Sequence, residues 1–427
     1  MKYGKKEISP NISLSYIITD RFKTENLNVN FLVPLKDSPF AQVLLPNVMS
    51  KGCREYPTQR LIRKQLDRLF NASAGIYLHS YGEYMSVCFS SSYLKNALAY
   101  ESCDISGLTA EMLYKIMLDG LVENGSFSEE YTEREKENKC QALKAVINNK
   151  DAYASNRCLQ LMCQGEATSF LYSIDTEPYE KLNGELLYKA YKNMIKTSPV
   201  IITYVGEDED FAERFAKRIS DSIKSEQRLP LNAEKTVKFP EKIRYFEEEH
   251  DVKQARLVIG FRDEISNDET TYAKAVFDEM YGMSPMSKLF CNVREKQSLC
   301  YYCSSSRNHK TGIMTVKTGI KAENKDRAYN EILHQLDCMK KGEFTKEELE
   351  NAKKGLISQV LSVKDSPEAL SSLLFKGAVN GKMLTPEEEA ERIKSVTEKD
   401  VVNCCRHITP DTVYFMYGKG VQEDEDE

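Results

Sequence analysis

Apolar positions in the first half of the chain alternate between the spacing of strands and the spacing of helices. Segments 12–19 and 29–35 predict strands, and Ser38 and Pro39 predict the N-cap and first position of a helix that follows them. The pattern then predicts a helix over residues 58–70 and a hairpin over 76–90. It further predicts a long helical region over 107–163, a strand over 198–208 and a helix over 211–224. Within the helical region, a charged helix is expected from Phe127 through Ile147.

The second half repeats this order of elements. It predicts a strand over residues 254–262, helices over 268–280 and 286–295, and a hairpin-like pair of strands over 299–306 and 312–320. A helical region over 325–405 and a last strand over 412–420 follow. Two local matches support a duplication, because FSEEYTEREK at 127–136 resembles FTKEELENAK at 344–353, and YVGE at 204–207 resembles MYGK at 416–419. The offsets of these matches are 217 and 212 residues, so two similar units of about 210 residues are expected.

The fold class follows from this duplication. We predict an α+β fold of two tandem related domains, each a mostly antiparallel sheet flanked by helices, facing each other across a cavity. The predicted domains are 1–225 and 252–427, joined by a linker at 226–251 that mixes charge and proline without clear periodicity. The acidic end EDEDE, 423–427, predicts a solvated, disordered tail.

Charge and hydropathy exclude several classes of partner. The net charge is −6, and basic residues are interleaved with acidic ones, so no nucleic-acid surface is expected. The N-terminus MKYGKKEISPN has no apolar stretch after its lysines, and no apolar run approaches the length of a membrane span. These features predict a cytoplasmic protein that does not engage a membrane.

The twelve cysteines are scattered, and reduced thiols are expected. Only Cys300 and Cys303, in Cys-Tyr-Tyr-Cys, have the spacing of a metal or redox pair. They lie in a segment that favours a strand, where residues three apart point to opposite faces. The spacing therefore favours buried strand cysteines over a metal or redox site.

One segment of the second half carries a family resemblance. GMSPMSKLFCNVREKQSLCYYCSSS, 282–306, is similar to the second-half signature of the pitrilysin/insulinase family of zinc metallopeptidases, including the spacing from Arg294 to Tyr301. The segment DVKQARLVIGF, 251–261, resembles that family's second-half opening strand. Lys288 departs from the pattern, since the family usually has arginine there. The resemblance extends over nearly the whole chain, and to bacterial members named for association with modification of elongation factor P.

The resemblance implies a zinc motif in the first half, and this chain lacks it. Active members carry H-x-x-E-H on a helix, in which two histidines on one helix face bind Zn²⁺ and the glutamate activates a bound water. Anchoring on Lys51 and Gly52 places Val43 and Asn47 at the histidine positions and Pro46 at the glutamate position. Anchoring on Glu135 and Lys136 places Ala142 at the position of the third ligand.

These four residues predict a chain without a metal site or a catalytic group. Valine and alanine have no donor atom, asparagine is a poor zinc ligand, and proline cannot take a proton. Pro46 either lies within a helix, where it removes the bond to Gln42 at a cost of about 3 kcal/mol, or begins a new helix. The five histidines are His79, His250, His309, His334 and His407, and none forms H-x-x-x-H or H-x-x-E.

The resemblance also implies a role for Arg294 and Tyr301. In the family this pair donates hydrogen bonds to the substrate carbonyl that becomes an oxyanion, so the two residues are predicted to bind substrate. The alternative is structural, with Arg294 near the negative pole of a helix and Tyr301 in a strand core.

Three functions remain open from the sequence. The first is a non-catalytic subunit of a heterodimeric peptidase, which acts on a peptide or unfolded polypeptide together with a zinc-bearing paralogue. Strand 76–80 would then offer an edge to an extended peptide. The second is a structural scaffold, and the third is a peptidase that uses a non-standard metal site.

Overall fold

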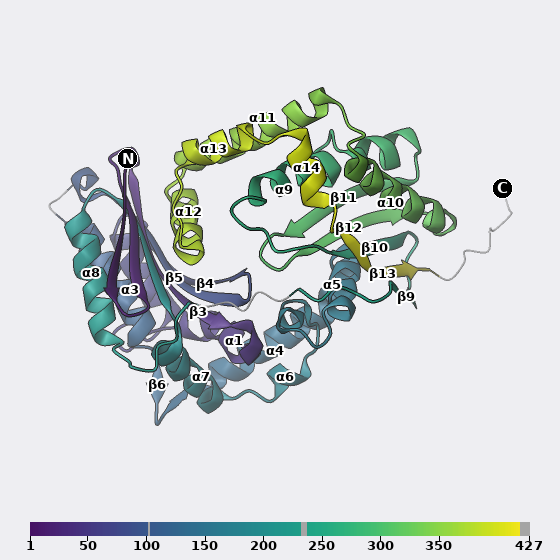
Figure 1. Ribbon diagram of the computed structural model, residues 1–427. Helices are drawn as coiled ribbons and strands as arrows, with labels where there is room; N and C mark the ends of the chain where they lie inside the picture. The colour runs from purple at the N-terminus through teal and green to yellow at the C-terminus, as the bar shows by residue number, and fades with distance from the viewer. Residues whose placement is uncertain (101–102, 232–236, 419–427) are drawn as a thin grey trace. The chain divides into compact units, whose positions relative to one another are not determined.

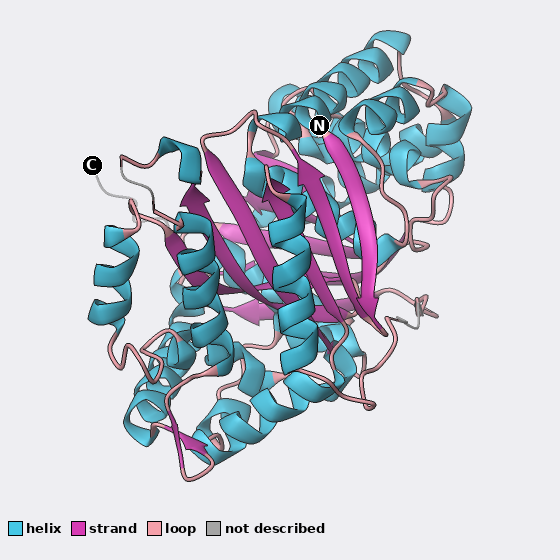
Figure 2. Ribbon diagram, turned by 90° about the vertical axis from the view of Figure 1, so that its left-hand side faces the viewer, coloured by secondary structure: helices cyan, strands magenta, loops and turns pink. Residues whose placement is uncertain are grey.

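The computed structural model describes residues 1–100, 103–231 and 237–418. The chain forms two compact units, each built from more than one stretch of sequence (Figure 1). The segments of unit 1 are Met1–Leu143, Asp175–Ala233 and Ser362–Thr385, and those of unit 2 are Lys144–Ile174, Glu234–Leu361 and Pro386–Glu427. Each unit has one large sheet flanked by helices, which confirms the α+β fold with two related domains (Figure 2).

Unit 1 contains a six-stranded sheet in the order β1-β2-β8-β3-β5-β4. Neighbouring strands are antiparallel except β2 and β8, which are parallel. The strands are β1 (Lys2–Ser9), β2 (Ile12–Ile18), β3 (Thr24–Pro34), β4 (Ser73–Tyr81), β5 (Tyr84–Leu94) and β8 (Val200–Gly206), with a separate hairpin of β6 (Val122–Glu123) and β7 (Ser126–Phe127). The helices are α1 (Phe40–Met49), α2 (Gln59–Arg68), α3 (Ile105–Leu118), α4 (Glu129–Ala145), α6 (Glu177–Glu180), α7 (Gly184–Thr197), α8 (Glu209–Ser222) and α12 (Pro367–Asn380).

Unit 2 contains a five-stranded sheet in the order β11-β12-β10-β13-β9. It is antiparallel except for the parallel pair β13 and β9. The strands are β9 (Arg244–Glu249), β10 (Ala255–Arg262), β11 (Cys300–Asn308), β12 (Ile313–Ile320) and β13 (Thr409–Tyr417). The helices are α5 (Lys150–Met162), α9 (Thr271–Asp278), α10 (Lys325–Lys341), α11 (Lys346–Ser362), α13 (Pro386–Lys394) and α14 (Glu398–Cys405), with two π-helical segments, η5 (Glu279–Met283) and η6 (Leu289–Lys296).

Each sheet is covered on one face by a helix from the other half of the sequence. In unit 1, Leu370 and Leu374 of α12 pack on Ile17 of β2. In unit 2, α5 packs on β10 and β13, and Gly260 permits the close approach because a Cβ there would lie 2.5 Å from Met162 Sδ. The linear boundaries 1–225 and 252–427 do not describe this exchange, because a strand pattern does not tell which helix will cover it.

Three local predictions need correction. The helix begins one residue later than expected, with Pro39 as N-cap, because Ser38 has a left-handed φ of 47° that ends the preceding turn. The predicted helical region 107–163 is interrupted by the β6–β7 hairpin. Part of the predicted linker is the edge strand β9, which gains its order from pairing with β13. Residues 232–236 of that linker, and the acidic tail, lie outside the described residues.

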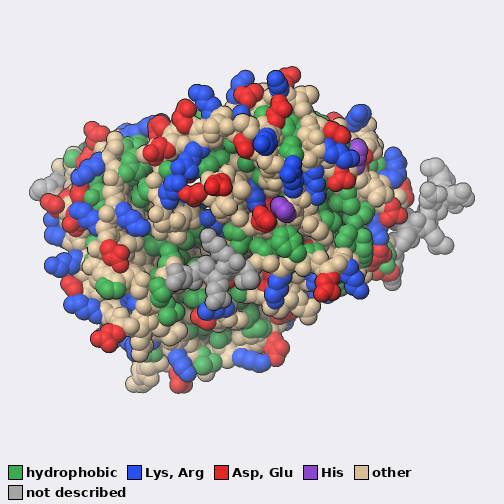
Figure 3. Space-filling model, viewed as in Figure 1, with side chains coloured by type: hydrophobic (Ala, Val, Ile, Leu, Met, Phe, Trp, Pro, Cys, Tyr) green, Lys and Arg blue, Asp and Glu red, His purple; other side chains and the backbone are tan. Residues whose placement is uncertain are grey.

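The surface carries charges of both signs. On the face shown in Figure 3, lysine and arginine side chains are interspersed with aspartate and glutamate. This distribution offers no large single-sign patch on that face for a polyanion to bind. Over the described residues, none of the helices combines the length and apolar character needed to cross a bilayer.

Candidate functional site

The first candidate region lies on α1 of unit 1, at the positions that the resemblance aligns with the family's zinc motif. A single helix spans all three positions, so Pro46 lies inside α1 and does not begin a new helix. Val43 and Asn47 are four residues apart and share one helix face, where Val43 is half-buried and Asn47 is exposed. The backbone geometry of a two-ligand helix is therefore present, but neither side chain can bind zinc.

Helix α4 supplies the second part of this region. Ala142 is exposed, and it lies on the same side of α4 as the buried Glu135, seven residues earlier. Lys51 Nζ lies 2.8 Å from Glu135 Oε1, which brings the end of α1 and the face of α4 together as the alignment of both segments with the family requires. Burial opposes the charge on Glu135, but hydrogen bonds from Lys51 and Asn138 outweigh it and lower the pKa of this carboxyl.

A lysine lies close to the missing third ligand. Lys139 is three residues before Ala142, and its Nζ lies 5.4 Å from the centre of the Tyr179 ring. The Tyr179 ring packs edge-on against Phe40 of α1, with 5.3 Å between ring centres. Burial lowers the pKa of Lys139. A cation and two aromatic rings thus occupy the neighbourhood where a divalent ion would need anionic or imidazole ligands.

The residues present do not fit a zinc ion. Over residues 1–100, 103–231 and 237–418, no group of three or more histidine, cysteine, aspartate or glutamate side chains is arranged to hold a metal. The alternative of a peptidase with a non-standard metal site therefore has no ligand set among these residues.

The second candidate region is in unit 2, on η6. Arg294 lies in this π-helical segment, and the buried side chains of Leu289 and Val293 anchor the segment to the core of unit 2. Its side chain is 39% exposed, its guanidinium stacks 4.5 Å from the Phe290 ring centre, and its Nε lies 3.3 Å from Glu295 Oε1. π-Helical turns are rare and frequently mark functional sites, because they re-aim side chains at the expense of regular hydrogen bonding.

Tyr301 also lies on irregular backbone. It is the extra residue of a β-bulge, because Cys300 pairs with Ile320 and Tyr302 pairs with Gly319 on the neighbouring strand β12. Its side chain is 62% exposed, and within the described residues its phenol has no hydrogen-bond partner. Bulges on edge strands turn a side chain out of the alternating pattern. The strand-core position that the structural alternative expected for Tyr301 is wrong, whereas Arg294 does lie in the last turn of η6, as that alternative expected.

A short connection holds η6 and β11 together. The Leu299 N–H donates to the Val293 carbonyl over 3.2 Å, and Ser298 turns the chain with a left-handed φ of 51°. Arg294 and Tyr301 are not joined by a hydrogen bond or ion pair to each other, although they come from consecutive elements. Lys288, where the family usually has arginine, binds Glu348 of α11 at 2.8 Å and so anchors the start of η6.

The same bulge corrects the prediction for the cysteine pair. The inserted Tyr301 shifts the alternation by one residue, so Cys300 and Cys303 face the same core and do not point to opposite faces. Cys300 and Cys303 lie opposite Ile320 and Thr318, two residues apart on β12, so the two thiols are neighbours on that face. A bulge leaves no mark in a hydrophobic pattern, so sequence reasoning missed this arrangement.

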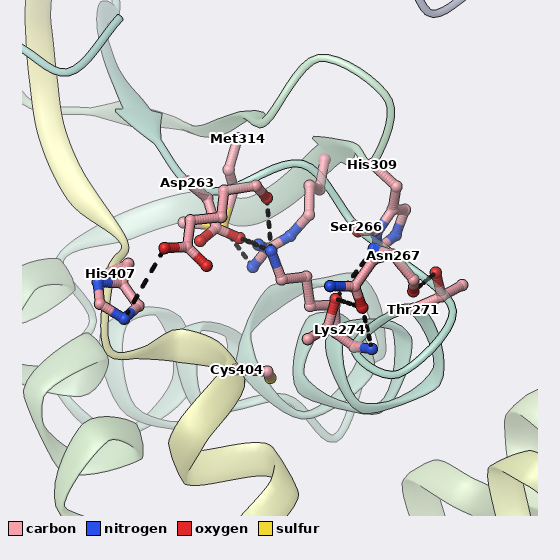
Figure 4. Close-up of polar contacts among 12 residues, drawn as sticks. Asp263, Ser266, Asn267, Thr271, Lys274, His309, Met314, Cys404 and His407 are labelled. Carbon is pink, nitrogen blue, oxygen red and sulfur yellow. Dashed lines mark hydrogen bonds and ion pairs between the residues drawn. The ribbon is translucent and has the colours of Figure 1, made fainter. Parts of the chain in front are cut away.

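A buried ionic cluster in unit 2 was also missed (Figure 4). Arg307 is 1% exposed and bonds to Asp263 and to Asp278, with 2.8 Å between Nε and Asp278 Oδ1. Lys274 Nζ, also buried, lies 2.9 Å from Asp263 Oδ2. Burial opposes the charge on Arg307, but the two carboxylates outweigh it and raise the pKa of this group.

Part of this cluster has the residue types of a hydrolase triad. Ser266 Oγ lies 3.0 Å from His309 Nδ1 (Figure 4). His309 Nε2 lies 3.1 Å from Asp278 Oδ2. However, the second approach lacks hydrogen-bond alignment, Asp278 already binds Arg307, and Ser266 is buried. The arrangement clamps the loop after β10 to the end of β11 and has no accessible nucleophile.

The comparison with known proteins identifies a family that the chain resembles. Residues 181–356 match the family model described as the peptidase M16 inactive domain. This segment of the chain is similar to the M16 peptidases. M16 is the pitrilysin/insulinase family that the sequence predicted, and the matched residues include Arg294 and Tyr301 but neither α1 nor α4.

Similarity to a curated protein and to a solved structure extends over nearly the whole chain. The chain is 29% identical over 404 residues to the "Probable inactive metalloprotease YmfF" of Bacillus subtilis, covering 94% of each protein. It is 24% identical over 229 residues to the "Uncharacterized zinc protease YmxG" of the same bacterium, covering 53% of this chain and 54% of that one. The crystal structure of a conserved protein from Enterococcus faecalis has the same fold, with a TM-score of 0.88, 24% identity and coverage of 98% and 99% of the two chains.

Proposed function

We propose that this M16 homologue is the non-catalytic subunit of a heterodimeric peptidase. In this proposal it supplies Arg294 and Tyr301 to a peptide or unfolded polypeptide, and a zinc-bearing paralogue supplies the metal. The observation that carries the proposal is the contrast between the two regions. All four zinc-site positions lack the required groups, whereas Arg294 and Tyr301 are kept exposed on irregular backbone.

The chemistry of the pair suits stabilisation of an oxyanion. A guanidinium and a phenol donate hydrogen bonds, and their placement before the reaction avoids reorganisation as charge develops on the substrate carbonyl oxygen. The exposed phenol of Tyr301 has no competing partner among the described residues. The zinc of the partner would polarise the same carbonyl and activate the water.

Peptide binding is supported by an open sheet edge. Strand β4 lies at the end of the sheet of unit 1, so one side of its backbone has no neighbouring strand in that sheet. Ile76–Ser80 lies within β4, and Tyr77 there is 59% exposed. An extended peptide can pair with such an edge through main-chain hydrogen bonds, with little dependence on sequence.

The partner is proposed from the family. Bacillus subtilis has both a relative named as a probable inactive metalloprotease and a relative named as a zinc protease. Homologues with and without a zinc site in one organism are what a heterodimer requires. A closer likeness to the type associated with elongation factor P stays a prediction.

The test is co-expression of this chain with a zinc-bearing paralogue from its own genome. We expect a stable complex that cleaves an unstructured fluorogenic peptide, whereas this chain alone does not. Arg294→Ala should lower kcat about 10²- to 10³-fold, the usual cost of one oxyanion donor, and Tyr301→Phe should also lower it. Lys296→Ala, at an exposed position of η6, is the matched control and should leave kcat unchanged.

Two outcomes would contradict the proposal. Cleavage by the isolated chain would show that it has its own catalytic site. An intact, active complex whose turnover is unaffected by both Arg294→Ala and Tyr301→Phe would indicate the structural scaffold.

A further inference from the structure

The cysteines on either side of Tyr301 form a pair that the proposed function does not use. Cys300 is half-buried and Cys303 is 4% exposed, and the bulge places both on the core face of β11. Their partners on β12 are Ile320 and Thr318, two residues apart, so the two thiols are neighbours on that face. Two neighbouring thiols, one of them reachable from solvent, have the arrangement of an attacking and a resolving cysteine.

The electrostatic environment distinguishes the two thiols. The hydrogen bond from Cys303 stabilises the Cys300 thiolate, and bonds to Thr318 and the charge of Arg294 add to it, so the pKa of Cys300 falls to about 7 despite burial. The bond to Cys300, together with burial, raises the pKa of Cys303. Cys300 is also the more exposed of the two thiols and is therefore the nucleophile, and the arginine whose charge favours its thiolate belongs to the proposed substrate-binding pair.

We propose that Cys300 and Cys303 are a reversible thiol modification site that is oxidised by hydroperoxides, and that its oxidation state sets the position of Tyr301. Oxidation of the two cysteines is a property of this chain alone. The effect on Tyr301 rests on the proposed function only where peptide turnover is the measurement.

The reaction balances without another reactant. The Cys300 thiolate attacks the terminal oxygen of the hydroperoxide, the O–O bond breaks, and the alkoxide leaves as an alcohol after taking a proton, which gives a sulfenic acid. The Cys303 sulfur then attacks Cys300 Sγ, the S–O bond breaks, and the hydroxide leaves with the Cys303 proton as water. The two sulfurs lose two electrons in total, and the peroxide gains them. A small dithiol reverses the reaction by exchange.

Closing this bond draws the two cysteines closer together. Their partners on β12, Ile320 and Thr318, are two residues apart, so the bulge already brings the Cα atoms of Cys300 and Cys303 to about 7 Å, the upper limit for a disulfide. Most disulfides have Cα atoms about 5.5–6 Å apart, so the stretch between the cysteines must shorten, and Tyr301 is its unpaired residue. The oxidised form would therefore present the phenol differently, and the reduced form is the one described here.

The site can be tested on the full chain by reaction with hydrogen peroxide at pH 7. At that pH, a pKa of about 7 in place of 9 raises the thiolate fraction roughly 50-fold, and the lower nucleophilicity removes about 8-fold of this. We therefore expect oxidation at Cys300 to be about five to ten times faster than at an ordinary thiol. Peptide mapping should find a Cys300–Cys303 disulfide, and Cys303→Ser should instead accumulate a sulfenic acid on Cys300 that dimedone traps.

Controls separate this site from general thiol oxidation. Cys291→Ser removes a different partly exposed thiol, which lies in η6, and should leave the rate of disulfide formation unchanged. A protein that forms no Cys300–Cys303 disulfide, or in which Cys300 reacts no faster than a small-molecule thiol of pKa about 9, would overturn the proposal.

The link to Tyr301 has its own measurement, which needs no active complex. With fluorotyrosine incorporated, the ¹⁹F resonance that is lost in Tyr301→Phe should shift when the chain is oxidised and return on reduction. An unchanged resonance in a chain that does form the disulfide would overturn the coupling. In an active complex, oxidation should lower peptide turnover of the wild type but not of the Cys300→Ser/Cys303→Ser variant, and an equal effect on both would also overturn it.

Discussion

One candidate region has a regular backbone but lacks the functional side chains, whereas the other has the functional side chains on an irregular backbone. In unit 1, α1 is a continuous helix that still presents Val43 and Asn47 on one face, but the side chains have no metal-binding groups. In unit 2, Arg294 and Tyr301 keep their donor groups, and the backbone that holds them is irregular, with a π-helical segment and a bulge. Irregular backbone costs stability and persists where the surrounding structure enforces it.

This difference distinguishes structure that is kept by packing from structure that is kept by function. A helix stays in place because its buried face packs, whatever its exposed residues can bind. A π-turn and a bulge bring no packing advantage of their own, so their presence under two exposed hydrogen-bond donors favours a role for those donors. Three measurements test this difference between the two regions.

The largest effect is expected from rebuilding the metal site of unit 1. Val43→His, Pro46→Glu, Asn47→His and Ala142→Glu together restore the ligand types on a helix whose geometry is intact. We expect this variant to bind one zinc per chain with micromolar or tighter affinity, about 8 kcal/mol, as measured by calorimetry and metal analysis. The same variant without Ala142→Glu is the control and should bind more weakly. Absence of zinc binding would show that the two helices have lost the site's geometry as well as its ligands.

The second test compares two arginines of unit 2. Arg307→Met leaves Asp278 buried without its guanidinium and should lower the free energy of unfolding by about 3–5 kcal/mol. Arg294→Met removes a half-exposed arginine with one neighbouring carboxylate and should change it by less than about 1 kcal/mol. Thermal unfolding followed by calorimetry measures both variants. Adding Asp278→Asn to Arg307→Met should recover part of the loss, and comparable losses for both arginines would remove the distinction between a structural and a functional residue.

The smallest effect is expected at the ion pair beside the vacant zinc site. Lys51→Met leaves the buried Glu135 without its closest cation and should cost about 1–3 kcal/mol at pH 7. Because the folded pKa of Glu135 lies below its ordinary value of 4.5, the pair's contribution is present above that pH and is lost as the pH falls through the folded pKa. The stabilities of the wild type and Lys51→Met should therefore converge in acid. Lys64→Met, on the exposed side of α2, should have an effect below about 0.5 kcal/mol at either pH.

The sequence predicted the classes of element well. Strands such as β10 and β13 have strong apolar patterns, and the anchors Lys51 and Glu135, aligned separately, meet in the structure at 2.8 Å. Predictions were wrong where tertiary contacts decide. Strand β9 was assigned to a linker, because its charged sequence is ordered only by its pairing with β13.

The arrangement of the second region could not be predicted in the same way. The bulge at Tyr301 changes the face that Cys300 occupies, but it depends on pairing with β12 and not on a local signal. The buried cluster around Arg307 joins residues from β10, α9 and β11 that are separated in sequence. Charged residues in a sequence normally predict a solvated surface, so such a cluster is hidden until the fold is known.

The exchange of α5 and α12 has a consequence for how the protein can be divided. A cut within 226–251 would separate α12 from the strands of unit 1 and α5 from those of unit 2. Each fragment would then expose an apolar sheet face and carry an unattached amphipathic segment, which are the conditions for aggregation or for reassembly of the two pieces. During synthesis, too, unit 1 must wait for nearly the whole polypeptide before its last covering element arrives.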